Sequence, residues 1–194
     1  MKKYQIIYAD PPWSYKDKRT RPIKNSPGGA GGAEKWYKTM DIEDIKNFKI
    51  SNISDDNCML FLWATAPLLP EAFEVIKAWG FEYKTVGFVW VKMKKDKTRE
   101  REGMGYYTMS NAEFVLIGLK GKYWRNKFGV RQILFAPKTK HSAKPPEIRN
   151  RIVEFCGDLP RIELFARKEE TLFPLKDWNG WDVWGNEVDS DIEL

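Results

Sequence analysis

Residues 10–13, Asp10-Pro11-Pro12-Trp13, join a carboxylate, two rigid residues and a large aromatic ring directly after an apolar segment. An exocyclic amine of a nucleobase is a poor nucleophile, because its lone pair is delocalised into the ring. A carboxylate and a neighbouring carbonyl can accept the two N–H bonds of such an amine and aim its lone pair at an electrophile. Asp10 and the Pro11 carbonyl suit these roles, and Pro12 stiffens the turn. The corner predicts methyl transfer to an amine such as N6 of adenine.

Trp13 is predicted to stack on the base, since enzymes that modify bases extrude them and an aromatic plane replaces part of the lost stacking. A structural alternative is that the two prolines only end a strand and that Trp13 packs against the core. The whole tetrad should occur by chance in on the order of a few per thousand chains of this length. This rarity favours the functional interpretation.

The elements around this corner are expected to form an α/β sheet that is mostly parallel. Helical periodicity and capping signals predict helices over about 41–47, 67–79 and 146–156. Apolar runs predict strands at 5–9, 58–64, 83–91, 113–119, 132–135, 161–166 and 181–184. The third and fourth of these strands are expected to pair as an antiparallel hairpin. Such sheets bind ligands beyond the carboxyl ends of their strands, which is where residues 10–13 lie.

Two polar segments are expected to be mobile loops. Residues 14–36 are basic and glycine-rich, which is typical of a lid or of a disordered segment. Residues 92–109 join the two hairpin strands and carry six basic residues, Lys92, Lys94, Lys95, Lys97, Arg99 and Arg101. Binding of nucleic acid and simple exposure of a solvated hairpin tip are alternative explanations of this positive charge. The acidic tail, residues 188–194, is expected to be frayed.

The bulk composition predicts a single domain over residues 1–194 that is cytoplasmic and has no membrane partner. Of its 194 residues, 42% are hydrophobic and 31% are charged, and no apolar run approaches the length that a bilayer requires. Cys58 and Cys156 are expected to be buried thiols, and with His141 as the only histidine no metal site is expected. The net charge of +6 favours a polyanionic partner, although such an excess is common in proteins that bind none.

The sequence resembles the mRNA (N6-adenosine) methyltransferase family, which includes bacterial and phage members, over nearly the whole chain. Besides Asp10 to Trp13, the family-like segments are WYKTM at 36–40, LFLWAT at 60–65, WVK at 90–92, HSAKP at 141–145, RIELFAR at 161–167 and WDVWGNE at 181–187. The resemblance implies a Rossmann-like S-adenosylmethionine-dependent methyltransferase with permuted motif order, in which the tetrad precedes the cofactor segments. That order accounts for the missing Gly-x-Gly-x-x-Gly turn after the first strand.

The resemblance also implies which residues bind S-adenosyl-L-methionine, namely Asp10, Lys144, Arg167, Asn186 and Glu187. The two cations suit the methionine carboxylate, while the amide and the carboxylate suit ribose hydroxyls. Plain alternatives are that Lys144 is solvated, that Arg167 pairs with Glu169 or Glu170, and that residues 186–187 only begin the tail. Eukaryotic catalytic subunits carry His-Asn soon after the arginine, where this chain has Lys168-Glu169, so part of that contact set differs. Upstream cofactor contacts and accessory RNA-binding modules are expected to be absent.

Substrate-binding candidates lie in or directly after the two loops and beside the Lys-Pro segment. They are Tyr37, His141, Ser142, Lys94, Lys95, Arg99 and Arg101. An ordinary hydrogen-bonded loop histidine explains His141 equally well. DNA is the preferred substrate, because compact stand-alone members look bacterial or phage-like, and RNA is the alternative. The remaining alternatives are a non-catalytic nucleic-acid-binding subunit and methylation of another exocyclic amine, such as N4 of cytosine. A homodimer is compatible with the nine tryptophans but is not indicated by them.

Overall fold

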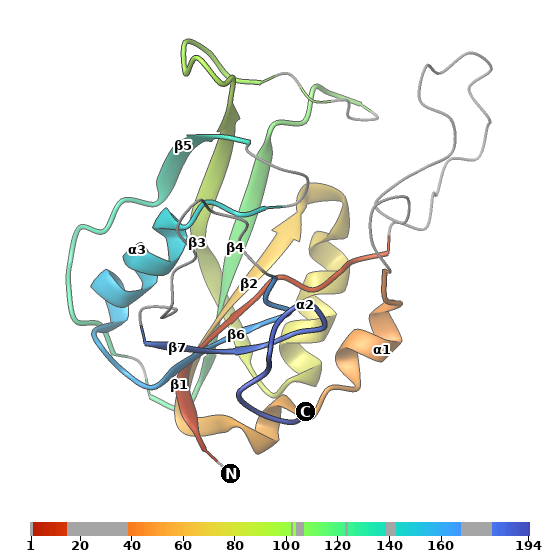
Figure 1. The fold of residues 1–194 in the computed structure, drawn as a ribbon, viewed down its shortest axis with the longest axis vertical. Helices are drawn as coiled ribbons and strands as arrows, with labels where there is room; N and C mark the ends of the chain where they lie inside the picture. Colours follow the sequence, from red (N-terminus) through yellow and green to blue (C-terminus); the bar gives the residue numbers. More distant parts are fainter. Residues whose placement is uncertain are drawn as a thin grey trace.

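The computed structural model describes residues 2–14, 39–101, 103, 107–122, 124–138, 143–167 and 180–194. These residues contain one seven-stranded sheet with the strand order β5-β3-β4-β2-β1-β6-β7 (Figure 1). Its strands are β1 Tyr4–Ala9, β2 Ser54–Thr65, β3 Glu82–Met93, β4 Ala112–Lys120, β5 Ile133–Pro137, β6 Arg161–Leu164 and β7 Trp181–Trp184. All seven predicted strands are therefore present, with ends that differ by a few residues.

The strand directions decide which side chains meet. Strand β1 is parallel to β2 and β6, β6 is parallel to β7, and β3 is parallel to β5. Strand β4 is antiparallel to both of its neighbours, β2 and β3. The expected mostly parallel sheet and the expected β3–β4 hairpin are both confirmed. As a result, the carboxyl ends of the six parallel strands and the amino end of β4 lie at one edge of the sheet.

Helices cover both faces of the sheet (Figure 1). Helices α1 Ile42–Lys46 and α2 Leu69–Ala78 lie on one face, and α3 Glu147–Cys156 lies on the other. Two short 3-10 helices, η2 Ile50–Asn52 and η3 Ala66–Leu68, precede β2 and α2. None of the helices in the described ranges is long and apolar enough to cross a membrane.

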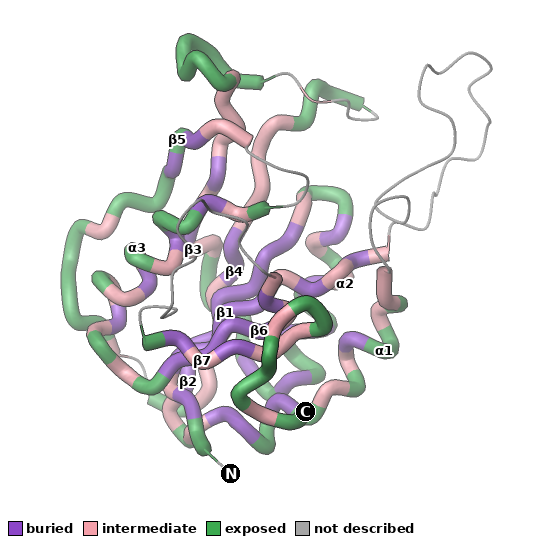
Figure 2. The backbone as a smooth tube through the Cα atoms, in the orientation of Figure 1, coloured by how far each residue is buried: buried purple, intermediate pink, exposed green. Residues whose placement is uncertain are grey.

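Strand β2 is buried on both of its faces, which explains the continuous apolar run at 58–64. Leu60 and Leu62 pack in the cluster that includes Val75 of α2. Phe61 and Trp63 alternate with them and pack in the second cluster, which includes residues of α3. Figure 2 shows this burial running through the central strands. A strand between two cores must be apolar at every position, so it lacks the alternation of a half-exposed strand.

Glycine ends both long helices, as predicted. Gly80 follows α2 with a φ of 86°, and Gly157 follows α3 with a φ of 92°. Both angles lie in the left-handed region, where a side chain is strained and glycine is favoured. Pro67, predicted in the first helical turn, lies in η3, so the predicted helix begins with one 3-10 turn before α2.

The two cysteines are buried thiols, as predicted. Cys58 lies in β2 in the first core, and Cys156 ends α3 in the second core. Burial raises the pKa of each thiol to about 12. Both side chains therefore stay protonated at neutral pH and act as small apolar groups.

The acidic tail packs against the protein, which differs from the expected fraying. The Asp191 backbone N–H donates to the Val183 carbonyl at 2.9 Å, and its carboxylate accepts the Val183 N–H at 2.8 Å. Ile192 and Leu194 pack against the first core. The acidic composition of the tail did not indicate that these two apolar residues would pack against the core. Their packing removes apolar surface from water that a frayed tail would expose.

Candidate active site

Asp10 lies where the connections between strands change direction. From β1 the chain continues to β2 on one side, whereas from β6 it continues to β7 on the other. β1 and β6 are neighbours, and the Asp10 N–H donates to the Leu164 carbonyl at the end of β6, at 3.5 Å. Open α/β sheets bind ligands beyond the strand ends at such a switch point. The tetrad therefore stands at the expected ligand site.

Backbone hydrogen bonds hold the corner in one conformation. The Trp13 N–H donates to the Pro11 carbonyl at 2.8 Å. Met40 lies alongside, where its N–H donates to the Pro12 carbonyl at 2.8 Å and its carbonyl accepts the Ser14 N–H at 3.2 Å. Since both prolines also fix their own φ angles, the Pro11 carbonyl has a defined direction.

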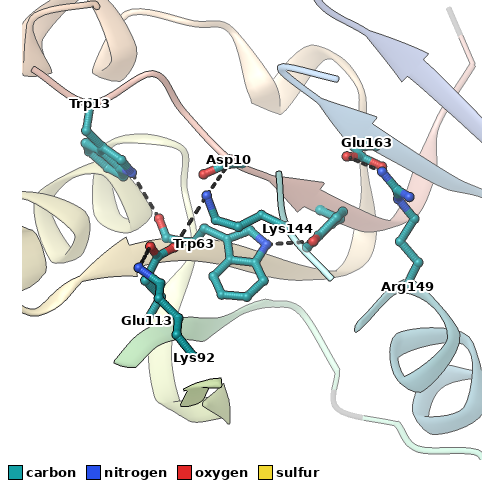
Figure 3. A network of polar contacts seen from close by, with 9 residues as sticks. Asp10, Trp13, Trp63, Lys92, Glu113, Lys144, Arg149 and Glu163 are labelled. Atoms are coloured by element: carbon teal, nitrogen blue, oxygen red, sulfur yellow. Dashed lines mark hydrogen bonds and ion pairs between the residues drawn. The ribbon is translucent and has the colours of Figure 1, made fainter. Parts of the chain in front are cut away.

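The Trp13 ring is buried, with 6% of the residue exposed. Its Nε1 donates to the Trp63 carbonyl at 3.1 Å, and the Nε1 of Trp63 donates to the Tyr8 hydroxyl at 2.6 Å (Figure 3). This packing agrees with the structural alternative for Trp13. Stacking on a base stays a prediction, and it would have to use the small part of the ring that is accessible.

Four charged side chains of alternating sign form a chain that starts at Asp10 (Figure 3). The Nζ of Lys144 lies 2.7 Å from Oδ2 of Asp10 and 3.5 Å from Oε2 of Glu113. The Nζ of Lys92 donates to Oε1 of Glu113 at 2.5 Å. Lys144 is 14% exposed, so it is not the solvated lysine of the plain alternative. We refer to Asp10, Lys144, Glu113 and Lys92 as the charge chain.

Two tryptophan rings lie beneath the lysines of the charge chain. The Lys144 Nζ is 5.3 Å from the centroid of the Trp63 ring, and the Lys92 Nζ is 5.3 Å from that of Trp90. The Nε1 of Trp90 donates to the Ala136 carbonyl in β5 at 2.9 Å. Each ring thus provides an apolar surface next to one ammonium group and makes a favourable cation–π contact with it.

The environment shifts the pKa values of the two carboxylates of the charge chain in opposite directions. Burial raises the pKa of Asp10, and the positive charges of Lys144 and Arg167 oppose that rise without cancelling it. Burial also acts to raise the pKa of Glu113, but Lys144 and Lys92 together lower it below its ordinary value. Asp10 therefore takes up a proton more readily than Glu113, which stays ionised and holds both lysines.

The candidate list from the sequence lacked Glu113, Lys92 and Trp63. A signal for Glu113 existed, because it is the one acidic residue at the start of an otherwise apolar strand. In an antiparallel hairpin, the start of the second strand lies at the same edge as the end of the first. Lys92 was named among the six basic residues of its loop and within the family-like segment at 90–92, and Trp63 within the segment at 60–65, but neither was assigned to the site.

The chain segments after β6 and β7 touch each other through their backbones. The Ala166 N–H donates to the Trp184 carbonyl at 2.9 Å, and a Cβ at Gly185 would lie 2.4 Å from the Ala166 carbonyl oxygen. Phe165 turns the chain with a φ of 60°, a strained value of the kind that collects at functional sites. This contact brings Arg167 close to residues 186–187, both of which are exposed.

The structure brings some of the remaining candidates to the site. The Arg101 N–H donates to the Lys92 carbonyl at 2.7 Å, so Arg101 lies beside the charge chain. The other three candidates of this loop lie at a turn, where the Lys94 N–H donates to the Arg99 carbonyl at 3.0 Å and Lys95 is exposed. Outside the described residues lie Tyr37, His141, Ser142, Glu169, Glu170 and most of the predicted lid.

Comparison with known proteins identifies the family of this chain. A model of the MT-A70 family matches residues 4–187. The protein named "Type II methyltransferase M.MunI" from a Mycoplasma species is 38% identical, over 100% of this chain and 82% of that relative. The "N(6)-adenosine-methyltransferase MT-A70-like protein" of Drosophila melanogaster is 26% identical over 96% of this chain, and a rice relative is 24% identical over 95%. This chain spans only about a quarter of those two eukaryotic proteins, 27% and 23% of their lengths. The chain therefore belongs to the MT-A70 family of methyltransferases.

Proposed function

We propose that this protein transfers a methyl group from S-adenosylmethionine to N6 of adenine in DNA. One observation carries the proposal. The Asp10 carboxylate and the fixed Pro11 carbonyl stand together at the switch point of the sheet, between strands β1 and β6, with Lys144 bound to the carboxylate. Two acceptors side by side match the two N–H bonds of an exocyclic amine.

The residues at this edge fit S-adenosylmethionine. Lys144 and Arg167 supply positive charge close to Asp10, as a methionine carboxylate requires. The exposed Asn186 and Glu187 offer an amide and a carboxylate for ribose hydroxyls, beside the close backbone contact at Gly185. When bound, the cofactor supplies an electrophilic methyl group on a sulfonium centre.

Asp10 and Pro11 would then act on the amine by orientation. The Pro11 carbonyl already accepts the Trp13 N–H, which fixes its direction and leaves a second lone pair for one N–H of the amine. The Asp10 carboxylate accepts the other N–H while Lys144 holds its Oδ2 atom. The amine becomes acidic only as it gains the methyl group, so Asp10 first orients it and then receives its proton. The raised pKa of Asp10 suits this second role.

Trp13 contributes to this arrangement mainly as an anchor. Its buried ring and its hydrogen bond to the Trp63 carbonyl hold the corner against β2. Positioning of this kind is worth a large factor in rate, because about 1 Å of misplacement can cost about 100-fold. We therefore propose that Trp13 fixes the positions of the Asp10 carboxylate and the Pro11 carbonyl rather than stacking on the base.

The preference for DNA rests on the relatives. The one at 38% identity is named a type II methyltransferase, a class that modifies DNA, and this chain covers 82% of its length. The relatives named for adenosine methylation are about four times as long as the region that matches here. A DNA substrate also implies an intracellular location.

The test is to incubate the protein with methyl-labelled S-adenosylmethionine and with DNA or RNA of the same sequence, and to identify the labelled nucleoside by mass spectrometry. We expect N6-methyladenine in DNA, and Asp10→Asn should lower kcat by about 100- to 1000-fold. Asp55→Asn, at the opposite end of β2, is the matched control and should keep its activity. Label only in RNA would overturn the DNA assignment, and N4-methylcytosine would overturn the adenine assignment. Nucleic-acid binding without cofactor consumption would indicate a non-catalytic subunit.

A further inference from the structure

The edge strand β5 exposes apolar side chains that the proposed reaction does not use. Ile133 is 49% exposed and Phe135 is 59% exposed. Leu134 and Ala136, which alternate with them along the strand, are buried in the second core. Phe128, in the segment that precedes the strand, is 70% exposed. Large apolar side chains gathered on one exposed edge mark a surface that contacts a partner.

Arginines surround these apolar side chains. The Arg125 guanidinium lies 3.4 Å from the centroid of the Phe128 ring. An open hollow of about 600 Å³ is lined by Arg151 and by residues 131–135, and no acidic residue is among them. We call Arg131, Ile133, Phe135 and Arg151 the β5 surface. Guanidinium groups interleaved with aromatic rings complement a polyanion that carries flat rings, which is the chemistry of nucleic acid.

The free edge of β5 is closed to pairing with another strand. The Gln132 carbonyl accepts the Val89 N–H from β3, so the neighbouring carbonyls of residues 131 and 133 point outward. The Arg151 side chain donates to both of these carbonyls, at 2.6 Å and 2.9 Å. A partner strand, from a second copy or from another protein, would have to displace this arginine. Contact through side chains is the mode that remains.

The β5 surface leads directly to the candidate active site. Ala136 is paired with Lys92, and Lys138 follows the end of the strand. Burial lowers the pKa of Lys138, and the charges of Lys92 and Arg101 lower it further, so the three cations lie close together and favour an anion. Lys138 lies five positions after Ile133, or about 16 Å at the usual rise of a strand. This length corresponds to about five nucleotides of one DNA strand.

We propose that the β5 surface binds the nucleic acid that flanks the target base, about five nucleotides beyond the cations Lys92, Arg101 and Lys138. The inference rests on the proposed function, because it takes the nucleic-acid substrate from it. The arginines contact phosphates, and Ile133 and Phe135 pack against sugars or splayed bases. This contact adds affinity for long substrates without touching the reacting adenine, so it should appear in KM rather than in kcat.

The test uses the double variant Phe135→Ser with Arg131→Ala, and two DNA hairpins of 6 and 20 base pairs centred on an adenine that the wild type methylates. The matched control is Tyr83→Ser with Lys77→Ala, which removes an exposed aromatic at the start of β3 and a cation of α2, away from the part of β3 that pairs with β5. For the 20-base-pair hairpin, the β5 variant should raise KM and Kd about tenfold. It should also reduce the salt slope of binding by about one. With the 6-base-pair hairpin, and in the control variant, the values should match those of the wild type.

The outcomes separate the two proposals. If the wild type methylates the long hairpin and the β5 variant equals the control, the β5 surface does not bind DNA and the proposed function stands. If the wild type methylates no DNA, the hairpins are centred on an arbitrary adenine; when the β5 variant alone then loses affinity in fluorescence anisotropy, the proposed function fails and the surface assignment stands. If the wild type sediments as a dimer, and the β5 variant is a monomer with unchanged DNA affinity, the surface binds a second copy and the inference is overturned.

Discussion

Gly185→Ala is expected to separate the two chain segments that we assign to cofactor binding. The added Cβ would lie 2.4 Å from the Ala166 carbonyl oxygen and 2.8 Å from the Ala166 nitrogen. Backbone atoms cannot swing aside as the end of a side chain can. The segment after β7, with Asn186, must therefore move away from the segment after β6, with Arg167.

The size of the effect follows from the overlap. Raising the shortest contact from 2.4 Å to the 3.0 Å that real Cβ atoms respect requires a shift of at least about 0.6 Å. Overpacking of this kind costs about 1–3 kcal/mol of unfolding free energy. In a chain of this length that lowers Tm by about 2–12 °C. A shift of this size should also weaken binding of S-adenosylhomocysteine about tenfold, since losing one hydrogen bond costs about 1.4 kcal/mol, which is about tenfold in Kd.

Titration calorimetry with S-adenosylhomocysteine, together with thermal unfolding, measures both effects. Gly118→Ala is the matched control, because its Cβ would meet Phe81 at 3.0 Å and Ile76 at 3.2 Å in the core beside α2. It should lower Tm while the folded protein keeps its affinity for the cofactor analogue. If Gly185→Ala bound S-adenosylhomocysteine as tightly as the wild type, the assignment of the β6 and β7 ends to the cofactor would be refuted.

Two further substitutions test the corner itself. Burial raises the pKa of Asp10 above its ordinary value of 3.8, so the folded state holds this proton more tightly than the unfolded chain and ionisation lowers stability. The stability of the wild type relative to Asp10→Asn should therefore be highest below about pH 4 and should fall as pH rises through the folded pKa of Asp10. Thermal unfolding of both proteins across pH measures this difference. A relative stability that rises with pH would contradict the raised pKa. Trp13→Phe removes the donor to the Trp63 carbonyl and should lower the unfolding free energy in urea by about 1–3 kcal/mol, with little change in KM for DNA. Unchanged stability with a raised KM would instead favour stacking of Trp13 on the base.

Much of the fold was predictable from local patterns. The run at 58–64 had to be a strand buried on both faces, and α2 and α3 followed from apolar spacing, early prolines and terminal glycines. Such signals depend on neighbours within a few positions of the chain. Asp10 was predictable for the same reason, because a residue that directly follows a buried parallel strand lies at the ligand edge.

The contacts of the site were less predictable. Asp10 and Lys144 are 134 positions apart, and their ion pair exists only because β1 and the segment before α3 end at the same edge. Glu113 reaches that edge because β4 runs antiparallel between β2 and β3. The packed tail is a similar case, since Ile192 and Leu194 pack against a core whose residues are spread over positions 4–164.

The sequence by itself determined which segments are strands and helices, and that the tetrad stands at a strand end. Tertiary structure alone decided that Asp10 joins a charge chain, that Trp13 is buried and that β5 exposes its apolar side chains. The reason is physical. Periodicity and capping act over a few residues. Burial and charge pairing depend on contacts between segments that are distant in the sequence, and these contacts form only when the sheet assembles.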